Sequence, residues 1–175
     1  MQKTKIERIC SFTGHRPKFF PWGDDLTDKR AMLLLNELKG EVMLAVNEGF
    51  NTFLCGGAQG VDTWVANIIL DLKEKYPYIK LIIVLPFEGY NSFITEINYS
   101  RTVKYADEII VVGVEKGVKG FTKRDHYMID RSERVIAVYD ERSKIKSGTY
   151  RAVQYAKEKR KDIRFILWMD YLAEQ

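Results

Sequence analysis

A glycine-rich turn between a strand-like run and a helix-like run is the first candidate for chemistry in this sequence. Thr52-Phe53-Leu54-Cys55 suits a buried strand and leads directly into Gly56-Gly57-Ala58-Gln59-Gly60. Glycine adopts positive φ and lets a ligand approach the backbone closely. A helix that begins just after such a turn presents free N–H groups and the positive end of its dipole, which suit a phosphate. The alternative is a tight strand-to-helix turn that holds no ligand.

Three further segments with unusual residues also follow strand-like runs. By segment, the candidate ligand-binding residues are Thr13, Gly14, His15 and Arg16; Gly56, Gly57, Gly60 and Asp62; Arg124 and Asp125; and Ser147, Gly148 and Thr149. In open α/β sheets, ligands bind beyond the carboxyl ends of the strands, near the point where the strand order reverses. We therefore expect the four segments to converge on one rim. Arginine pairs with phosphate oxygens through parallel hydrogen bonds, so the pattern predicts a nucleotide-like ligand.

The charges at this rim predict a division of roles. A carboxylate in the first turn of a helix suits the dipole, but it would repel a phosphate bound at the same terminus. We therefore expect Asp62 to accept a hydrogen bond from a ribose hydroxyl, while Arg16 and the helix start at Gly148-Thr149 hold phosphate. The alternative is that Asp62 only stabilises the start of its helix. At Gly60, a side chain would resist positive φ and project toward the phosphate.

The motifs of several familiar enzymes are absent. The turn after the first strand reads Phe12-Thr13-Gly14-His15-Arg16-Pro17. It lacks the Gly-x-Gly-x-x-Gly of dinucleotide dehydrogenases, and the chain has no Gly-x-x-x-x-Gly-Lys-Ser/Thr phosphate loop. Neither His15 nor His126 has a second His or Cys at metal spacing, so we expect no metal site. No complete catalytic constellation is present, so enzyme activity stays open, and no cofactor is predicted.

The elements that must position these residues alternate between strand and helix. Strands are predicted at residues 9–12, 52–55, 80–85, 109–112, 135–139 and 165–169. Helices are predicted from a cap at Thr27 to a stop at Gly49, from residue 61 to Tyr76, at 90–105, from a capping box at 122–125, and at 148–161. The alternation predicts a Rossmann-like, doubly wound parallel sheet in a three-layer α/β/α fold, as a single domain over residues 1–175. The leading strand order is 3-2-1-4-5-6.

Composition describes a soluble globular protein, with 46% hydrophobic and 30% charged residues among 175. The net charge of +4 is mild, so a nucleic-acid partner is disfavoured but not excluded. Cys10 and Cys55 lie in apolar runs and are expected to be reduced and buried. No apolar run reaches the ~20 residues of a membrane span, and residues 1–8 are too polar for a signal peptide. We expect a cytoplasmic protein without a membrane partner; whether its aromatic loop at 19–22 closes over a base or mediates self-association stays open.

These segments carry a family resemblance. Ser11-Phe12-Thr13-Gly14-His15-Arg16-Pro17, Gly56-Gly57-Ala58-Gln59-Gly60-Val61-Asp62, Arg124-Asp125 with Met128, and Ser147-Gly148-Thr149 resemble the YpsA-like family. That family belongs to the SLOG superfamily, together with DNA-processing protein A domains and the LOG (lysine decarboxylase-like) phosphoribohydrolases. The resemblance implies a Rossmann-like fold and a pocket for nucleotides or NAD-derived molecules such as ADP-ribose. Position by position, the implied ligand contacts are Gly14, Arg16, Gly57, Gly60, Asp62, Gly148 and Thr149.

One departure from the LOG pattern bears on activity. LOG enzymes carry Pro-Gly-Gly-x-Gly-Thr and a glutamate three residues after the threonine, whereas this chain has Lys146-Ser147-Gly148-Thr149 and Ala152. The loss of that carboxylate weakens the case for N-glycosidic hydrolysis. The leading interpretation is therefore a module that binds or senses a nucleotide or an ADP-ribose-like molecule. The alternatives are a nucleotide N-glycosidase of the LOG type and a single-stranded DNA-binding module like DNA-processing protein A.

Overall fold

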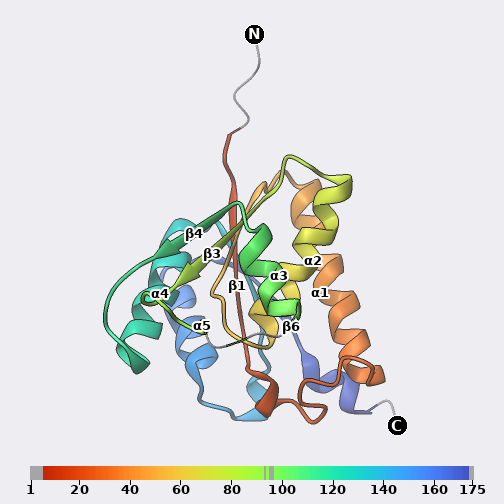
Figure 1. Ribbon diagram of the computed structural model, residues 1–175. Coiled ribbons are helices and arrows are strands. Elements are labelled where there is room, and N and C mark those ends of the chain that lie inside the picture. Colours follow the sequence, from red (N-terminus) through yellow and green to blue (C-terminus); the bar gives the residue numbers. More distant parts are fainter. Residues whose placement is uncertain (1–5, 93, 95–96, 174–175) are drawn as a thin grey trace.

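A single parallel sheet of six strands forms the centre of the protein (Figure 1). The computed structural model describes residues 6–92, 94 and 97–173. The strands are β1 (Ile9–Gly14), β2 (Thr52–Cys55), β3 (Lys80–Leu85), β4 (Glu108–Val111), β5 (Arg134–Val138) and β6 (Asp162–Ile166). The helices are α1 (Lys29–Asn47), α2 (Val61–Lys75), α3 (Ile97–Tyr105), α4 (Gly117–Arg131) and α5 (Gly148–Glu158), with short 3-10 helices η1 (Pro17–Phe19), η2 (Glu141–Ser143) and η3 (Trp168–Ala173).

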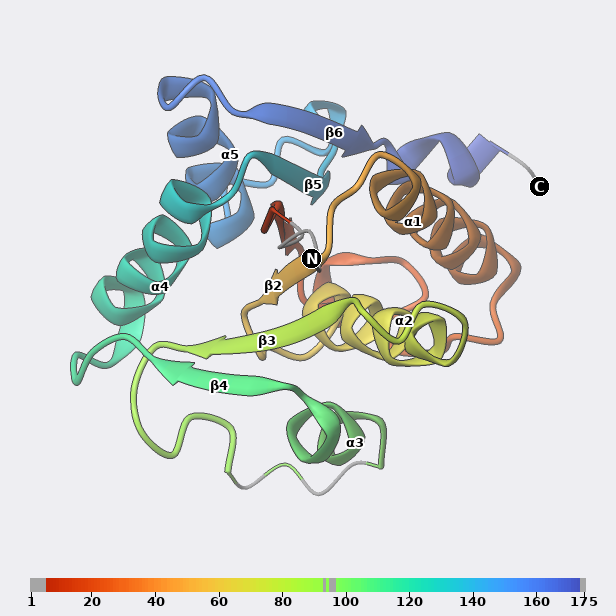
Figure 2. The same ribbon diagram turned by 90° about the horizontal axis from the view of Figure 1, so that it is seen from above.

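Helices cover both faces of the sheet. Helices α1, α2 and α3 lie on one face, and α4 and α5 pack together on the other (Figure 2). This arrangement confirms the predicted Rossmann-like α/β/α fold. The single domain over residues 1–175 stays a prediction. Within the described part of the chain, no helix is long and apolar enough to cross a membrane.

The strand order is β4-β3-β2-β1-β5-β6, so the predicted order 3-2-1-4-5-6 was wrong in the place of β4. Strand β4 pairs with β3 at the edge of the sheet, and β5 takes the position beside β1. Burial explains the difference. Most of β4 is exposed, which suits an edge, whereas every residue of β5 is buried, which suits an interior strand. The order therefore reverses between β1 and β5, and a ligand is expected beyond the carboxyl ends of these two strands.

Helix α1 shows how the sequence pattern produces an element. Its buried stripe consists of Ala31, Leu34, Leu38, Val42, Ala45 and Val46. The 3.6-residue period of the sequence predicts these positions and Leu35, but Leu35 is only partly buried. The predicted cap at Thr27 was wrong by one residue, because the Asp28 carboxylate accepts the backbone N–H of Arg30 at 2.8 Å. The Arg30 guanidinium also pairs with Asp28 at 2.6 Å, so the cap is both hydrogen-bonded and ion-paired.

Other predicted boundaries moved where local signals were weak. Helix α4 begins at Gly117, so the predicted capping box at residues 122–125 lies inside the helix. There the Asp125 carboxylate pairs with Arg124 and caps nothing. The helix predicted at 90–105 is α3 and begins at Ile97; residues 93, 95 and 96 lie outside the described part. Helix α5 ends at Glu158, not residue 161, and β6 lies three residues earlier than predicted.

Candidate functional site

A cavity of about 500 Å³ lies at the carboxyl edge of β1 and β5, where the strand order reverses. We call it the edge cavity. The predicted site residues that line it are Thr13, Gly14, His15, Arg16, Asp62, Arg124, Asp125, Ser147, Gly148 and Thr149. They come from the end of β1, the start of α2, α4 and the start of α5. The expected convergence on one rim is therefore what the structure has, although ligand binding by these residues stays a prediction.

The three glycines of the central turn pack against the protein itself and do not line the edge cavity. A Cβ on Gly56 would lie 2.7 Å from the Asp62 carboxylate and 2.8 Å from the Arg124 guanidinium. Gly57 has a φ of +68°, and its carbonyl accepts a hydrogen bond from the Asn91 amide at 2.9 Å. Gly60 caps α2 with a φ of +93°. A Cβ there would lie 2.8 Å from the carbonyl oxygen of His15, so the β1 loop crosses directly over this glycine.

Two buried charges lie at the floor of the edge cavity. The guanidinium of Arg124 donates to the Gly56 carbonyl at 2.7 Å and to Asp125 Oδ1 at 2.9 and 3.0 Å. Burial raises the pKa of the Asp62 carboxyl, and the Arg124 charge and the N–H of Ala58, 3.2 Å from Asp62 Oδ2, act against that rise. Burial also disfavours the Arg124 cation, but Asp125 and Asp62 outweigh this effect and hold its pKa above the ordinary value. The charged side chains therefore stabilise one another inside the fold.

Another wall of the edge cavity is formed by the start of α5. The Ser147 hydroxyl accepts the backbone N–H of Thr149 at 3.2 Å and so caps the helix. Gly148 is the first helical residue, and the exposed cation Arg151 follows within the first turn. Lys18, from η1, lines the same cavity. The positive end of the helix dipole, Lys18 and Arg151 thus line this part of the cavity, which suits a phosphate group.

His15 is a buried neutral residue at the cavity wall. Its side chain is 1% exposed, and its ring packs against four aromatic rings, those of Phe19, Phe20, Tyr139 and Trp168. Nδ1 lies 3.0 Å from the Ser147 hydroxyl, and Nε2 has no hydrogen-bond partner among the described residues. Burial lowers the pKa of His15 from 6.5 to about 4. The ring is therefore uncharged at neutral pH and does not attract an anion; it joins the β1 loop to the α5 start.

This burial predicts a dependence of stability on pH. Because the unfolded state binds the His15 proton near pH 6.5 and the folded state only near pH 4, stability falls as pH drops through that window. The expected loss is about 3 kcal/mol, from about 1.4 kcal/mol per pKa unit. Urea unfolding at pH 7 and pH 4.5 should show a smaller loss for His15→Gln than for the parent. His126→Gln is the control, and equal losses for the parent and His15→Gln would refute this assignment.

Several residues of the edge cavity were not predicted as site residues. Phe121 and Met128 of α4 add apolar wall, while Lys18 and Arg151 add charge. The helix predicted from residue 122 begins too late to include Phe121, because Lys116 at the start of α4 forms no side-chain cap. Met128 is part of the family resemblance only. A lone Lys or Arg on a surface helix carries no local signal, although Arg151, four residues after the Ser147 cap, could have been found by helical spacing.

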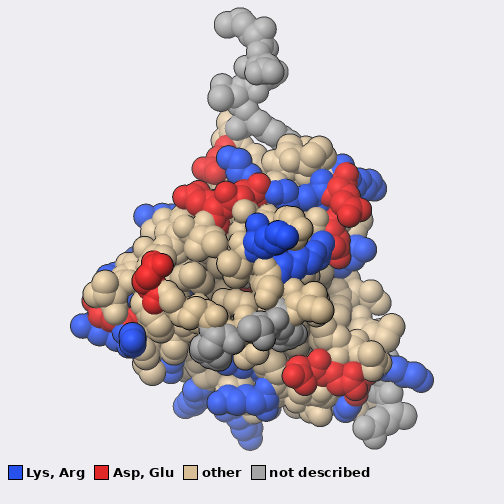
Figure 3. Space-filling model, viewed as in Figure 1, with Lys and Arg blue, Asp and Glu red and all other residues tan. Residues whose placement is uncertain are grey.

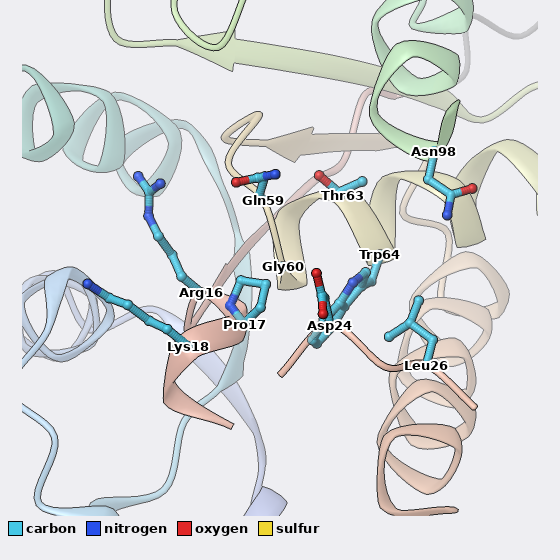
Figure 4. A pocket seen from close by; sticks show the side chains of 10 residues that line it. All are labelled: Arg16, Pro17, Lys18, Asp24, Leu26, Gln59, Gly60, Thr63, Trp64 and Asn98. Atoms are coloured by element: carbon cyan, nitrogen blue, oxygen red, sulfur yellow. The ribbon is translucent and has the colours of Figure 1, made fainter. Parts of the chain in front are cut away.

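A second cavity, of about 560 Å³, adjoins the first; we call it the flank cavity (Figure 4). It lies beside the start of α2 and is lined by Gly60 together with residues of η1, the following loop and α3. Arg16 and Lys18 line both cavities. The Arg16 guanidinium donates to the Tyr90 hydroxyl at 2.9 Å, which fixes it in the wall between them. In the part of the chain that is described, no group of three or more His, Cys, Asp or Glu could hold a metal ion.

A comparison with family models agrees with this architecture. The model YpsA, described as the YspA SLOG family, matches residues 10–171. The chain belongs to the YpsA family. This YpsA-family chain is 37% identical over 130 residues to the SPbeta prophage-derived protein YoqJ of Bacillus subtilis, a match that covers 66% of the chain and 74% of YoqJ. It is 31% identical over 109 residues to a UPF0398 protein of Staphylococcus haemolyticus, covering 59% of the chain and only 58% of that relative.

Solved structures show the same fold in two DNA processing proteins. The YpsA-family chain superposes on DNA processing protein A (DprA) of Streptococcus pneumoniae with a TM-score of 0.61 and 16% identity, covering 91% of the chain and 50% of DprA. DprA of Helicobacter pylori, which is described with a unique single-stranded DNA binding mode, gives a TM-score of 0.61 and 18% identity. That match covers 95% of the chain and 72% of the Helicobacter protein. At these identities the likeness shows the fold.

Proposed function

We propose that this protein binds a phosphorylated nucleoside, of the AMP or ADP-ribose kind, in the edge cavity. The observation that carries the proposal is that the edge cavity contains both cationic groups and carboxylates. The α5 start, Lys18 and Arg151 suit a phosphate, whereas Asp62 and Asp125 suit hydroxyl or amino groups. Phe121 and Met128 supply apolar surface for a base or sugar. Polar groups placed beside apolar surface are typical of small-molecule sites.

A thermal-shift series tests the proposal, since a ligand that binds the folded state raises the melting temperature. AMP and ADP-ribose should raise it, and adenosine, which lacks the phosphate, should have a much smaller effect. Arg151→Ala should weaken AMP binding at least about tenfold, as expected for the loss of one charged hydrogen bond. Arg131→Ala, an exposed arginine at the far end of α4, is the matched control. Equal shifts for AMP and adenosine would refute a phosphate site.

The carboxylates can be tested separately. Asp62→Asn keeps the size of the side chain and removes the charge that we assign to a ribose hydroxyl. We expect it to weaken AMP and ADP-ribose while leaving inorganic phosphate binding unchanged. Calorimetry on the purified variant measures both. A variant that binds AMP like the parent would leave Asp62 with a structural role only, through its hydrogen bond to the N–H of Ala58.

A nucleotide N-glycosidase is the less supported enzyme alternative. Ala152 occupies the position of the LOG glutamate, and its side chain is 2% exposed and packs with Ile129, Val135 and Ala156. We predict that the protein releases no adenine from AMP above the protein-free rate, because no carboxylate stands at this position to assist departure of the base. Chromatography of AMP incubated with the protein measures this. Multiple-turnover release that is lost in Asp125→Asn would show an enzyme.

Single-stranded DNA is the second candidate ligand, and the likeness to the Helicobacter DprA favours it more than the net charge suggests. Lys and Arg side chains also gather at the lower edge of the face in Figure 3, the side to which β1 runs in Figure 1. A strand that releases counterions binds with a steep dependence on salt. Oligothymidine that binds with a steep salt dependence and is displaced by AMP would support a strand in the edge cavity.

A further inference from the structure

We propose that the flank cavity is a second nucleoside subsite, so that the full ligand is two nucleosides joined through phosphate across Arg16 and Lys18. This inference rests on the proposed function of the edge cavity. The two cavities, of about 500 and 560 Å³, share these two residues as a common wall. Each alone has the volume of an ordinary small-molecule site. One mononucleotide in the edge cavity would therefore leave an adjoining space of similar size.

The lining of the flank cavity suits an uncharged planar group better than a second phosphate. Pro17, Leu26 and Trp64 provide apolar surface, and Gln59 and Asn98 provide neutral amides. Its remaining charge besides the shared wall is the exposed carboxylate of Asp24, which would repel a phosphate. Amides and a carboxylate can pair with the donors and acceptors on the edge of a base, while an aromatic face packs against its plane.

The cations of the shared wall point toward the other cavity. Figure 4 shows the side chains of Arg16 and Lys18 extending away from the residues on the far side of the flank cavity, such as Asn98 and Leu26. Their backbone forms the near side of the hollow, beside Gly60. Phosphate-binding charge is thus concentrated at the edge cavity and the dividing wall. This distribution matches a ligand with phosphate at its middle and an uncharged nucleoside at the flank end.

The Arg16 side chain is held for this role by the connection after β3. Its guanidinium donates to Tyr90 and lies 5.8 Å from the centre of the Phe121 ring. The next residue, Asn91, donates to the Gly57 carbonyl and ties the same connection to the turn after β2. The dividing wall is therefore built from three segments, and Arg16 has further donors left for a phosphate.

The test compares ligands of one and two units by calorimetry. Diadenosine diphosphate and 5′-phosphorylated dithymidine should bind at least about tenfold more tightly than AMP and thymidine monophosphate, respectively, because the second nucleoside binds in tethered form. Asn98→Trp should fill the flank cavity and remove this gain while leaving the mononucleotide affinities unchanged. Asn98 is exposed on α3, so the variant is expected to fold; Ser100→Trp, also exposed on α3, is the matched control.

Each remaining outcome has a definite meaning. Equal affinities for one- and two-unit ligands, both weakened by Arg151→Ala, would overturn the second subsite and leave the proposed function standing. If Asn98→Trp weakens AMP as much as diadenosine diphosphate, the flank cavity belongs to the mononucleotide site and the proposal is wrong. If no nucleotide binds at all, the proposed function is wrong, and the second subsite is wrong with it. Affinity that keeps rising from dithymidine to longer strands identifies a DNA strand as the source of the two units; a plateau at two identifies a free dinucleotide.

Discussion

Gly60→Ala is expected to lower the free energy of unfolding by about 2–5 kcal/mol, through about 1–2 for a side chain at positive φ and about 1–3 for the clash. The φ of Gly60 is +93°, and an added Cβ would lie 2.8 Å from both the carbonyl oxygen of His15 and Cδ of Pro17. Because one of these atoms belongs to the backbone, the β1 loop would have to move. Urea unfolding measures the change.

Gly23→Ala is the matched control for this variant. Gly23 also has positive φ, +60°, but a Cβ there would meet nothing within 4 Å. The control therefore carries a conformational cost without a clash, and the excess loss of Gly60→Ala reports the clash together with the different backbone conformation of Gly60, at ψ −132°. Equal losses for both variants would mean that the loop moves away freely. In that case the wall between the two cavities would be easily displaced.

Arg124→Leu is expected to lower the free energy of unfolding by about 3–5 kcal/mol, because it leaves Asp62 buried without its compensating charge. Arg124 is 8% exposed and also satisfies the carbonyl of Gly56. Lys123→Leu, next to it on α4 and paired with Glu115 at the surface, should change the free energy by less than about 1 kcal/mol. Urea unfolding of both variants at pH 7 gives the comparison.

The free energy of unfolding of Arg124→Leu should also depend on pH in a defined direction. Burial already raises the pKa of Asp62, and loss of the Arg124 charge raises it further. A group with a raised folded-state pKa binds its proton more readily when folded, so it favours folding as pH falls. The deficit of Arg124→Leu relative to the parent should therefore shrink between pH 7 and pH 5. A deficit that grows over this range would mean that Asp62 is not the group left uncompensated.

The fold followed from the sequence where each element carried its own signal. Alternating strands and helices predicted the parallel sheet, and the apolar stripe of α1 was confirmed at every position except Leu35, which is only partly buried. The predicted place of β4 was wrong, because it depends on which strand the sheet can leave exposed. That choice is made by the burial of β5 across its whole length, which is a property of the assembled layers.

The candidate site was likewise predictable only where its residues carried a local signal in the sequence. Glycines and charged residues after strands marked the segments that meet at the edge cavity, since the carboxyl ends of parallel strands share one edge. The apolar wall from Phe121 and the flank cavity were not predicted. Both depend on tertiary packing: the first on the start of α4, the second on how the loop that carries Leu26 lies against Trp64. No local pattern encodes such contacts.

The reversal of strand order between β1 and β5 also governs how the protein reaches its native state. Pairing of Cys10 with Arg134 closes most of the chain into one loop, which is an entropically slow step in folding. The two walls of the edge cavity, from the β1 loop and from α5, meet only after that closure. A ligand should therefore slow unfolding and leave the refolding rate unchanged, because its site is absent from the transition state. Stopped-flow kinetics with and without AMP would show slower unfolding in the presence of AMP. A faster refolding rate with AMP would mean that β1 and β5 pair before the folding transition state.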